Sequence, residues 1–152
     1  MTRGDKSVAA PAIRVRNLQR VVKVDVADLQ KYAESALQLC LQIQRDSTEL
    51  KKLAGVSVLI VSDRRMASLN RQFLNERGPT DVITFRHGEI CIGAETARRH
   101  ARRFENSLAR ELNLYVVHGL LHLHGFDDRS EVEARKMETA QRRILEKAAA
   151  GS

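Results

Sequence analysis

The order of apolar and polar residues along the chain identifies four candidate strands. Strict alternation is typical of a strand with one buried face, whereas a continuous run of β-branched residues is typical of a strand buried on both faces. The first pattern occurs at residues 13–17, and the second occurs at 56–61, which we expect to be a central strand. Residues 82–85 and 89–92 form two further short apolar runs separated by the polar turn 86–88, which predicts a hairpin or a bent edge strand.

A spacing of three or four residues between apolar positions identifies the segments expected to be helical. Three of them are preceded by a polar residue that can accept a hydrogen bond from the free N–H groups of the first turn. Asp25 and Asp63 are two such caps, and Ser130 with Glu133 forms a capping box before the last helix. We expect helices at residues 26–45, 63–73, 94–104, 107–123 and 130–147.

The order of these elements predicts the fold class. Strands interspersed with helices, with one hairpin-like pair, indicate an α+β fold with a small mixed four-stranded sheet and about five helices. The chain has 152 residues, which favours one domain with a sufficient hydrophobic core. We expect a disordered leader at residues 1–11, a single domain at 12–148 and a frayed tail at 149–152.

The cysteines and the apolar runs bear on the cellular compartment. Cys40 and Cys91 are too few for a disulfide framework, so we expect small buried residues in a reducing compartment. The N-terminus lacks the apolar stretch of a signal peptide, and no apolar run approaches transmembrane length. We therefore expect a cytoplasmic protein with no membrane partner.

The segment from His118 to Asp128 is the strongest candidate for a chemical site. His118 and His122 are four residues apart, so on a helix they lie on one face, one turn from each other. Gly125 then permits the left-handed turn that ends a helix, after which the chain can bring Asp127 or Asp128 back as a third ligand. Two imidazoles and a carboxylate suit zinc and leave a fourth position open, as in catalytic zinc sites.

Other interpretations of these residues stay open. Two histidines at this spacing can also be hydrogen-bonded core residues, and His124 points to the opposite side of the helix, where it is a surface residue or supports a ligand from behind. The helix of zinc peptidases has a glutamate after its first histidine, but Gly119 occupies that position here, which disfavours peptidase chemistry. We expect His87, in the polar turn, to be an exposed turn residue.

The charge of the chain favours a polyanionic partner. The formal net charge is +7 and the isoelectric point is near 9.9. Such charge gives salt-dependent, sequence-independent binding to phosphates, although most charge runs are simply solvated helix faces. The chain has only six aromatic residues, all Phe or Tyr, which argues against a base-stacking platform and favours recognition of a phosphate backbone and its shape. The basic residues cluster at Arg14, Arg16, Arg20 and Lys23 and at Arg98, Arg99, Arg102, Arg103 and Arg110.

Two sequence blocks resemble those of a known family. The segment from His118 to Asp128 resembles the YbeY signature, His-Gly-x-x-His-Leu-x-Gly-[Tyr/Phe]-x-His. The segment from Pro79 to Phe85, followed by Gly88-Glu89-Ile90, resembles the family's Pro-Thr-Asp-Val-Leu-Ser-Phe and Gly-Asp-Ile. The resemblance runs from about residue 12 to the C-terminal helix and implies a YbeY-like metallohydrolase domain, with the metal-binding helix packed on the sheet. It also implies a metal-dependent, single-strand-specific endoribonuclease that acts in maturation of small-subunit ribosomal RNA and in ribosome quality control.

The resemblance also implies specific site residues. It implies one zinc ion per chain, held by His118, His122 and Asp128, although the family usually has histidine at the third position. Leu74 stands where the family has a functional arginine, so Arg71 or Arg77 becomes the candidate phosphate contact, and no catalytic residue is assigned. The implied partners are ribosomal RNA and the small ribosomal subunit, and the oligomeric state stays open.

These departures from the family pattern support a second hypothesis. In it the protein is a non-catalytic RNA- or ribosome-binding assembly factor, the metal only joins the last helix to the metal-binding helix, and the basic surface binds the partner.

Overall fold

The computed structural model describes residues 11–46, 48–74 and 81–151. The expected leader lies outside the described residues apart from Pro11, and so does Arg77.

A four-stranded mixed sheet forms the centre of the fold, as the sequence predicted. Its strand order is β2-β3-β5-β4. β2 pairs with β3 and β3 with β5 in parallel, whereas β4 pairs antiparallel with β5 as the expected hairpin. The β-branched run lies in β3, which is an interior strand because it has a partner on each side. The strands are β2 (Ala12–Asn17), β3 (Gly55–Val61), β4 (Val82–Phe85) and β5 (Glu89–Gly93).

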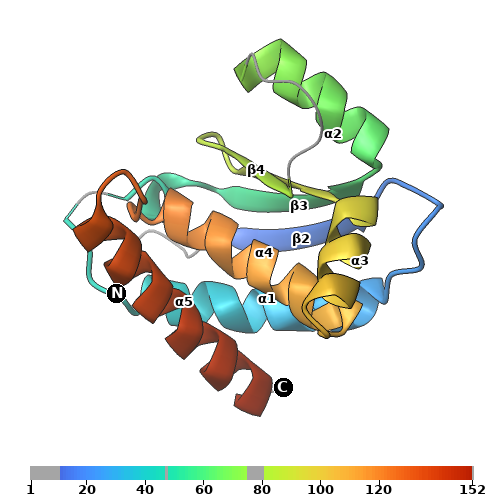
Figure 1. Ribbon diagram of the computed structural model, residues 1–152. Helices are drawn as coiled ribbons and strands as arrows, with labels where there is room; N and C mark the ends of the chain where they lie inside the picture. Colours follow the sequence, from blue (N-terminus) through green and yellow to red (C-terminus); the bar gives the residue numbers. More distant parts are fainter. Residues whose placement is uncertain (1–10, 47, 75–80, 152) are drawn as a thin grey trace, which may run out of the picture.

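Five α-helices surround this sheet unevenly. In Figure 1, α1, α4 and α5 lie on one side of the sheet, and α2 lies on the other side. A short 3-10 turn at Leu50–Lys52 precedes β3, and a π-helical turn at Asn70–Leu74 follows α2. The helices are α1 (Val26–Leu41), α2 (Asp63–Leu69), α3 (Ala94–Arg103), α4 (Leu108–Leu123) and α5 (Glu131–Gly151).

None of the helices in the described part of the chain is long and apolar enough to cross a membrane.

The two faces of the sheet carry two separate apolar clusters. Alternate strand residues such as Val58 and Ile90 are fully buried against α1, α4 and α5, and they form the main core. The opposite face carries a smaller cluster of Val61, Met66, Ile83 and Cys91 beneath α2. This second face is therefore covered less completely than the first, because one short helix contributes to its cluster.

Helix α1 ends at Leu41, four residues before the predicted end. The residues after it are held by tertiary contacts, because the Ile43 carbonyl accepts a hydrogen bond from His124 Nε2 at 2.6 Å and Arg45 stacks over the Phe126 ring at 4.0 Å. These contacts hold the chain beside the turn that follows α4, so the segment cannot continue as a helix.

Two helix ends differ from the prediction for local reasons. The N-cap of α2 is Ser62, whose hydroxyl accepts from the Arg65 N–H, because the Asp63 carboxylate instead accepts from the backbone and hydroxyl of Thr96. Helix α5 continues to Gly151, past the predicted end near Lys147, with Ala148 fully buried.

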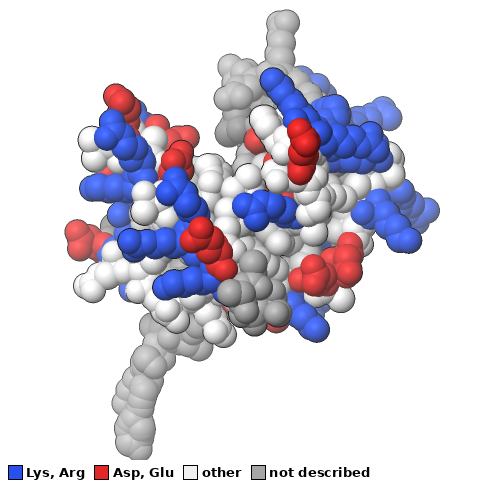
Figure 2. All heavy atoms as spheres, turned by 60° about the horizontal axis from the view of Figure 1, so that its bottom comes forward, with Lys and Arg blue, Asp and Glu red and all other residues white. Residues whose placement is uncertain are grey.

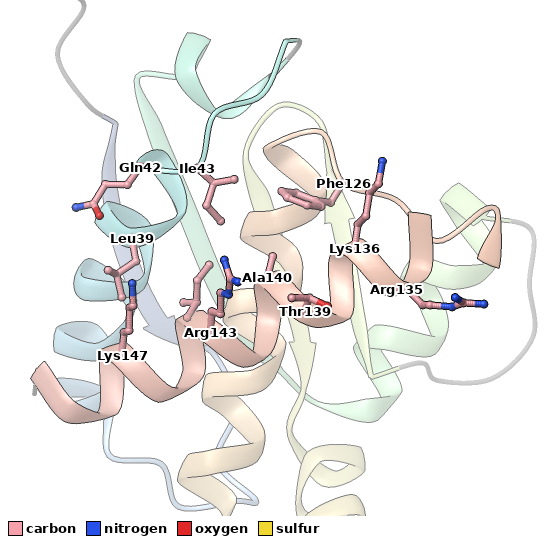
Figure 3. A pocket seen from close by; sticks show the side chains of 11 residues that line it. Leu39, Gln42, Ile43, Phe126, Arg135, Lys136, Thr139, Ala140, Arg143 and Lys147 are labelled. Carbon is pink, nitrogen blue, oxygen red and sulfur yellow. The ribbon is translucent and has the colours of Figure 1, made fainter. Parts of the chain in front are cut away.

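Helix α5 leaves an apolar hollow beside the end of α1. Figure 3 shows side chains of both elements around this space, which measures about 560 Å³. Its floor is apolar, and Arg143 and Lys147 are among the basic residues at its border. The apolar residues that line it are Leu39, Ile43, Phe126, Ala140 and Ile144.

Candidate metal centre

Helix α4 presents the two predicted histidine ligands side by side. Its N-terminus is capped by Ser107, whose hydroxyl accepts from the Arg110 N–H at 3.0 Å. Its apolar positions, including Val116 and Leu120, are fully buried in the main core. This packing fixes the rotation of the helix, so that His118 and His122 share one partly exposed face.

The hydrogen bonds of the two imidazoles leave both Nε2 atoms free to bind a cation. His122 Nδ1–H donates to the Phe126 carbonyl at 3.2 Å, and His118 Nδ1–H donates to Oε1 of Gln141 at 3.0 Å. In a neutral ring the other nitrogen then carries a lone pair. The two Nε2 atoms are 3.1 Å apart, so two lone pairs face the same small space.

This arrangement fits a zinc ion better than it fits a hydrogen-bonded core pair. For tetrahedral zinc with Zn–N bonds of 2.0–2.1 Å, two ligand nitrogens are separated by about 3.3 Å. The observed 3.1 Å is close to this separation. Nδ1 atoms held by a carbonyl and an amide oxygen are also typical of metal-binding histidines, whose outer hydrogen bonds orient the rings.

The pKa of His122 is lowered from its ordinary value. The main cause is burial, which disfavours the imidazolium, and the neighbouring His118 acts in the same direction. Asp128 and Asp127 oppose the shift, with the larger effect from Asp128. The neutral form that binds metal is therefore favoured at neutral pH.

A tight turn after α4 brings both aspartates toward the histidines. Gly125 has φ of 94°, a conformation that is strained for residues with a Cβ. The Phe126 N–H donates to the Leu121 carbonyl at 3.0 Å, which reverses the chain direction. Phe126 is buried, so the turn is anchored to the core.

The third predicted ligand, Asp128, is not gathered with the two histidines into one group. Asp128 is exposed, whereas Asp127 is partly buried and its Oδ1 accepts from the Arg129 N–H at 3.0 Å. Among the described residues, no three His, Cys, Asp or Glu side chains are gathered closely enough to hold a metal ion. The structure therefore brings two of the three predicted ligands together and places both candidate carboxylates nearby.

Gly119 is required by packing between α4 and β5. A Cβ at this position would lie 2.8 Å from Cδ1 and Cγ2 of Ile90, which is fully buried in β5. A contact this short requires neighbouring atoms to shift, so only glycine lets the helix approach the sheet this closely without strain. A glutamate, as in zinc peptidases, would have to point into the sheet, so its absence from α4 has a structural cause.

An open hollow of about 660 Å³ lies in front of the histidines. Val82 and Thr84 of β4 form one wall, and the turn after α4 forms another. Arg86 and Arg129 bring positive charge to the hollow, and Glu49 and Asp127 bring carboxylates. The two arginines equal the two carboxylates in number, so Arg86 and Arg129 are the groups of this hollow that can contact an anionic substrate beside the two imidazoles.

Of the two predicted phosphate contacts, the structure describes only Arg71. Arg71 is exposed on the π-helical turn after α2 and does not line this hollow, and the side chain of Leu74 and all of Arg77 lie outside the described residues. Arg86 and Arg129 were missed by sequence reasoning. Each directly follows a matched block, so proximity to both blocks was the available signal.

His124 is a core residue and not a surface residue. It lies on the side of α4 opposite the metal-binding pair, as predicted, but it is fully buried. Its Nε2–H donates to the Ile43 carbonyl, and its Nδ1 accepts from the Thr48 hydroxyl at 2.9 Å. Burial lowers its pKa, so it is a neutral residue that joins α4 to the segment after α1.

Comparisons with known proteins agree with the two matched blocks. A sequence model of the family described as endoribonuclease YbeY matches residues 14–149. An endoribonuclease YbeY of Chelativorans is 40% identical over 111 residues, which cover 64% of this chain and 68% of the relative. One of Acholeplasma laidlawii is 30% identical over 133 residues, covering 82% of this chain and 97% of the relative. The solution structure of a Thermotoga maritima protein has a similar fold, with a TM-score of 0.62, 27% identity and coverage of 91% and 90% of the two chains.

Proposed function

This chain belongs to the YbeY family of endoribonucleases, and from that membership we propose that it is a zinc-dependent enzyme that cleaves single-stranded RNA during maturation of the small-subunit ribosomal RNA. The proposed metal ligands are His118, His122 and a carboxylate from the turn after α4. The resemblance selects Asp128, and the lining of the hollow favours Asp127.

One observation supports metal binding more than any other. The Nε2 atoms of His118 and His122 are 3.1 Å apart, and their Nδ1 atoms are held by oxygen acceptors. A pair of neutral imidazoles in this arrangement has no hydrogen to share between the two Nε2 atoms. A bound cation removes that repulsion and uses both lone pairs.

The chain's own residues would bind and orient the substrate. Arg86 and Arg129 can hold phosphate oxygens in the hollow and stabilise the negative charge that develops there. A bound zinc ion would supply Lewis-acid polarisation of a phosphate oxygen or of a water molecule. Gly119 follows His118 directly, so the position that holds the general base of zinc peptidases carries no glutamate here. Attack by the 2′-hydroxyl of the RNA itself would need no protein nucleophile.

The test compares cleavage of a single-stranded ribosomal RNA fragment by the wild type and by His122→Ala, each with and without a chelator. We expect cleavage by the wild type alone, lost with the chelator and lost in the variant, which should also hold far less than one zinc per chain. Gln38→Ala, which alters an exposed residue of α1 outside this hollow, is the matched control and should keep both zinc and cleavage. Equal cleavage by wild type and His122→Ala would contradict the proposal and indicate a contaminating ribonuclease.

The second candidate, a non-catalytic assembly factor with a structural metal, is favoured by one observation. Only two of the three predicted ligands lie together among the described residues, and Asp128 is exposed. In this case zinc removal would lower the melting temperature, and the zinc-loaded wild type would bind RNA without cleaving it.

A further inference from the structure

The sheet face opposite α4 carries a row of residues suited to single-stranded RNA. Ile13 and Val15 of β2 point into the main core, so the alternate residues Arg14 and Arg16 point to the opposite face, where they are exposed. Strand pairing continues the row of Arg14 across the sheet, because Arg14 pairs with Ser57, Ser57 with Glu89, and Glu89 with Phe85. The row therefore begins with a cation and ends with an aromatic ring.

Three rings gather at the aromatic end of this row. His87 stacks on Phe85 with ring centres 5.6 Å apart and planes inclined by 25°. Phe73 meets Phe85 edge to face at 5.4 Å. The His87 side chain is 66% exposed and Phe73 is 57% exposed, so ring surface is available to a ligand. Exposed rings of this kind stack on nucleobases with little preference for sequence.

These rings border a hollow of about 620 Å³ between the sheet and α2. Its lining is mainly apolar, and Leu18, which is 54% exposed, forms one side. Arg65 of α2 also lines it. The apolar walls and aromatic edges of this space suit a nucleobase, and Arg65 suits the phosphate attached to it. We therefore favour a nucleotide over a charged peptide as the ligand.

Three arginines, one lining this hollow and two on β2, are available for phosphates. In the described part of the chain, Arg14, Arg16 and Arg65 take part in no ion pair. By contrast, Arg135, Lys136 and Arg142 on α5 each pair with a glutamate of the same helix. The only carboxylate that lines the hollow among the described residues is that of Glu89, and it faces His87 at 3.3 Å.

The edge strand β4 connects this face to the candidate metal centre. Successive side chains of a strand point to opposite faces, so Phe85 lines the hollow beneath α2, whereas Thr84 and Arg86 line the hollow in front of the histidines. β4 is the last strand of the sheet, and no other strand of the described residues pairs with its outer side. A single strand of RNA can therefore cross this edge, with bases on one face and a phosphate near the metal ligands on the other.

We propose that this face is a base-binding subsite for nucleotides adjacent to the cleaved bond of single-stranded RNA. The proposal rests on the proposed function, because it assumes that the chain acts on RNA. We call it the sheet-face site, and it consists of Arg14, Arg16, Arg65, Phe73, Phe85 and His87.

The test measures binding of a fluorescent 12-nucleotide single-stranded RNA by anisotropy, with a chelator present so that no metal-dependent cleavage occurs. Arg14→Ala/Arg16→Ala should raise Kd at least about tenfold and make the slope of log K against log salt shallower by about 1.4, since each phosphate contact on a single strand contributes about 0.7. Arg102→Ala/Arg103→Ala removes the same charge from exposed positions on α3 and should change Kd less than about twofold.

A second measurement separates the contribution of base stacking to binding from the contribution of charge. His87→Ala should raise Kd for the normal RNA about fivefold or more. The same variant should leave Kd for an RNA of equal length without bases unchanged. Because Arg14, Arg16 and His87 are exposed, each variant should keep the fold, and its circular dichroism spectrum should match that of the wild type.

The outcomes distinguish this proposal from the proposed function. If all variants bind RNA like the wild type, or if the α3 pair has the larger effect, the sheet-face site is refuted even when the wild type cleaves RNA. If the variants weaken binding to ribosomal subunits but not to free RNA, the face contacts a protein, which also refutes it. If the predicted losses occur and the zinc-loaded wild type does not cleave, the sheet-face site stands and the nuclease proposal fails.

Discussion

Gly119 affects both the packing of α4 against the sheet and the reactions that α4 can support. Its missing side chain lets the helix lie against Ile90, and it also removes the position where a zinc peptidase has its general base. Close packing against Ile90 therefore excludes a glutamate at this position, and with it the general base of a zinc peptidase.

Gly119→Ala should destabilise the protein. Alanine favours a helix over glycine by up to about 1 kcal/mol, but a Cβ placed 2.8 Å from Ile90 adds an overpacking cost of about 1–3 kcal/mol. We expect a net loss of about 1–2 kcal/mol in the free energy of unfolding, measured in urea. The same substitution in an Ile90→Ala background should cost less, and an equal or larger cost there would refute the clash.

The two thiols should be unreactive in the folded protein. Burial raises the pKa of Cys40 to about 12, and burial together with the charge of Glu89 raises the pKa of Cys91 to about 11, from an ordinary value of 9.0. At pH 8 each folded thiol should therefore react with a disulfide reagent roughly 100-fold or more slowly than in urea, because only the thiolate attacks.

The same pKa shifts predict a loss of stability in alkali. Between about pH 9 and 11 the unfolded chain releases thiol protons that the folded chain still holds, so the free energy of unfolding falls as pH rises. Replacing Cys91 with serine should reduce this fall. Rapid labelling of the native protein at pH 8 would contradict both expectations.

At the scale of elements, the candidate metal centre depends on contacts between helices that are distant in the sequence. His118 lies on α4, but the group that orients its ring, Gln141, lies on α5. The turn after α4 orients His122 through the Phe126 carbonyl. Helix α5 is therefore part of the site although it supplies none of the predicted ligands.

Gln141→Ala should weaken zinc binding without abolishing it. Loss of a hydrogen bond that orients a metal ligand typically lowers metal affinity by about 10–100-fold. Competition with a chromophoric chelator measures this affinity, and Gln38→Ala, at an exposed position of α1, is the matched control. If Gln141→Ala binds zinc as tightly as the control, the hydrogen bond to His118 does not support the site.

The sequence predicted the elements well because their patterns are local. The strands and the histidine pair follow from spacings within one segment, and the sheet and the hairpin were confirmed. The burial of His124 and the end of α1 could not be predicted, because both depend on a hydrogen bond between residues 81 positions apart. Arg86 and Arg129 were missed for the same reason, since only the fold brings β4 beside the turn after α4.

At the scale of the whole molecule, the positive charge is divided among several surfaces. On the face turned forward in Figure 2, Lys and Arg side chains gather on two sides of a largely uncharged middle, with Asp and Glu side chains among them. The ion pairs along α5 fit the solvated-helix interpretation of its charge. The arginines of the sheet-face site are better candidates for RNA contact, because they take part in no ion pair among the described residues. Only part of the positive charge behind the net charge of +7 is therefore expected to contact RNA.

The most direct test of the account is a zinc titration of the metal-free protein, with the cleavage rate of single-stranded RNA measured at each addition. We expect the rate to rise in proportion to added zinc and to reach a plateau at one equivalent per chain, because the two Nε2 atoms of His118 and His122 define one site. A melting temperature that rises to a plateau at one equivalent, with no cleavage at any zinc concentration, would contradict the account and establish a structural metal.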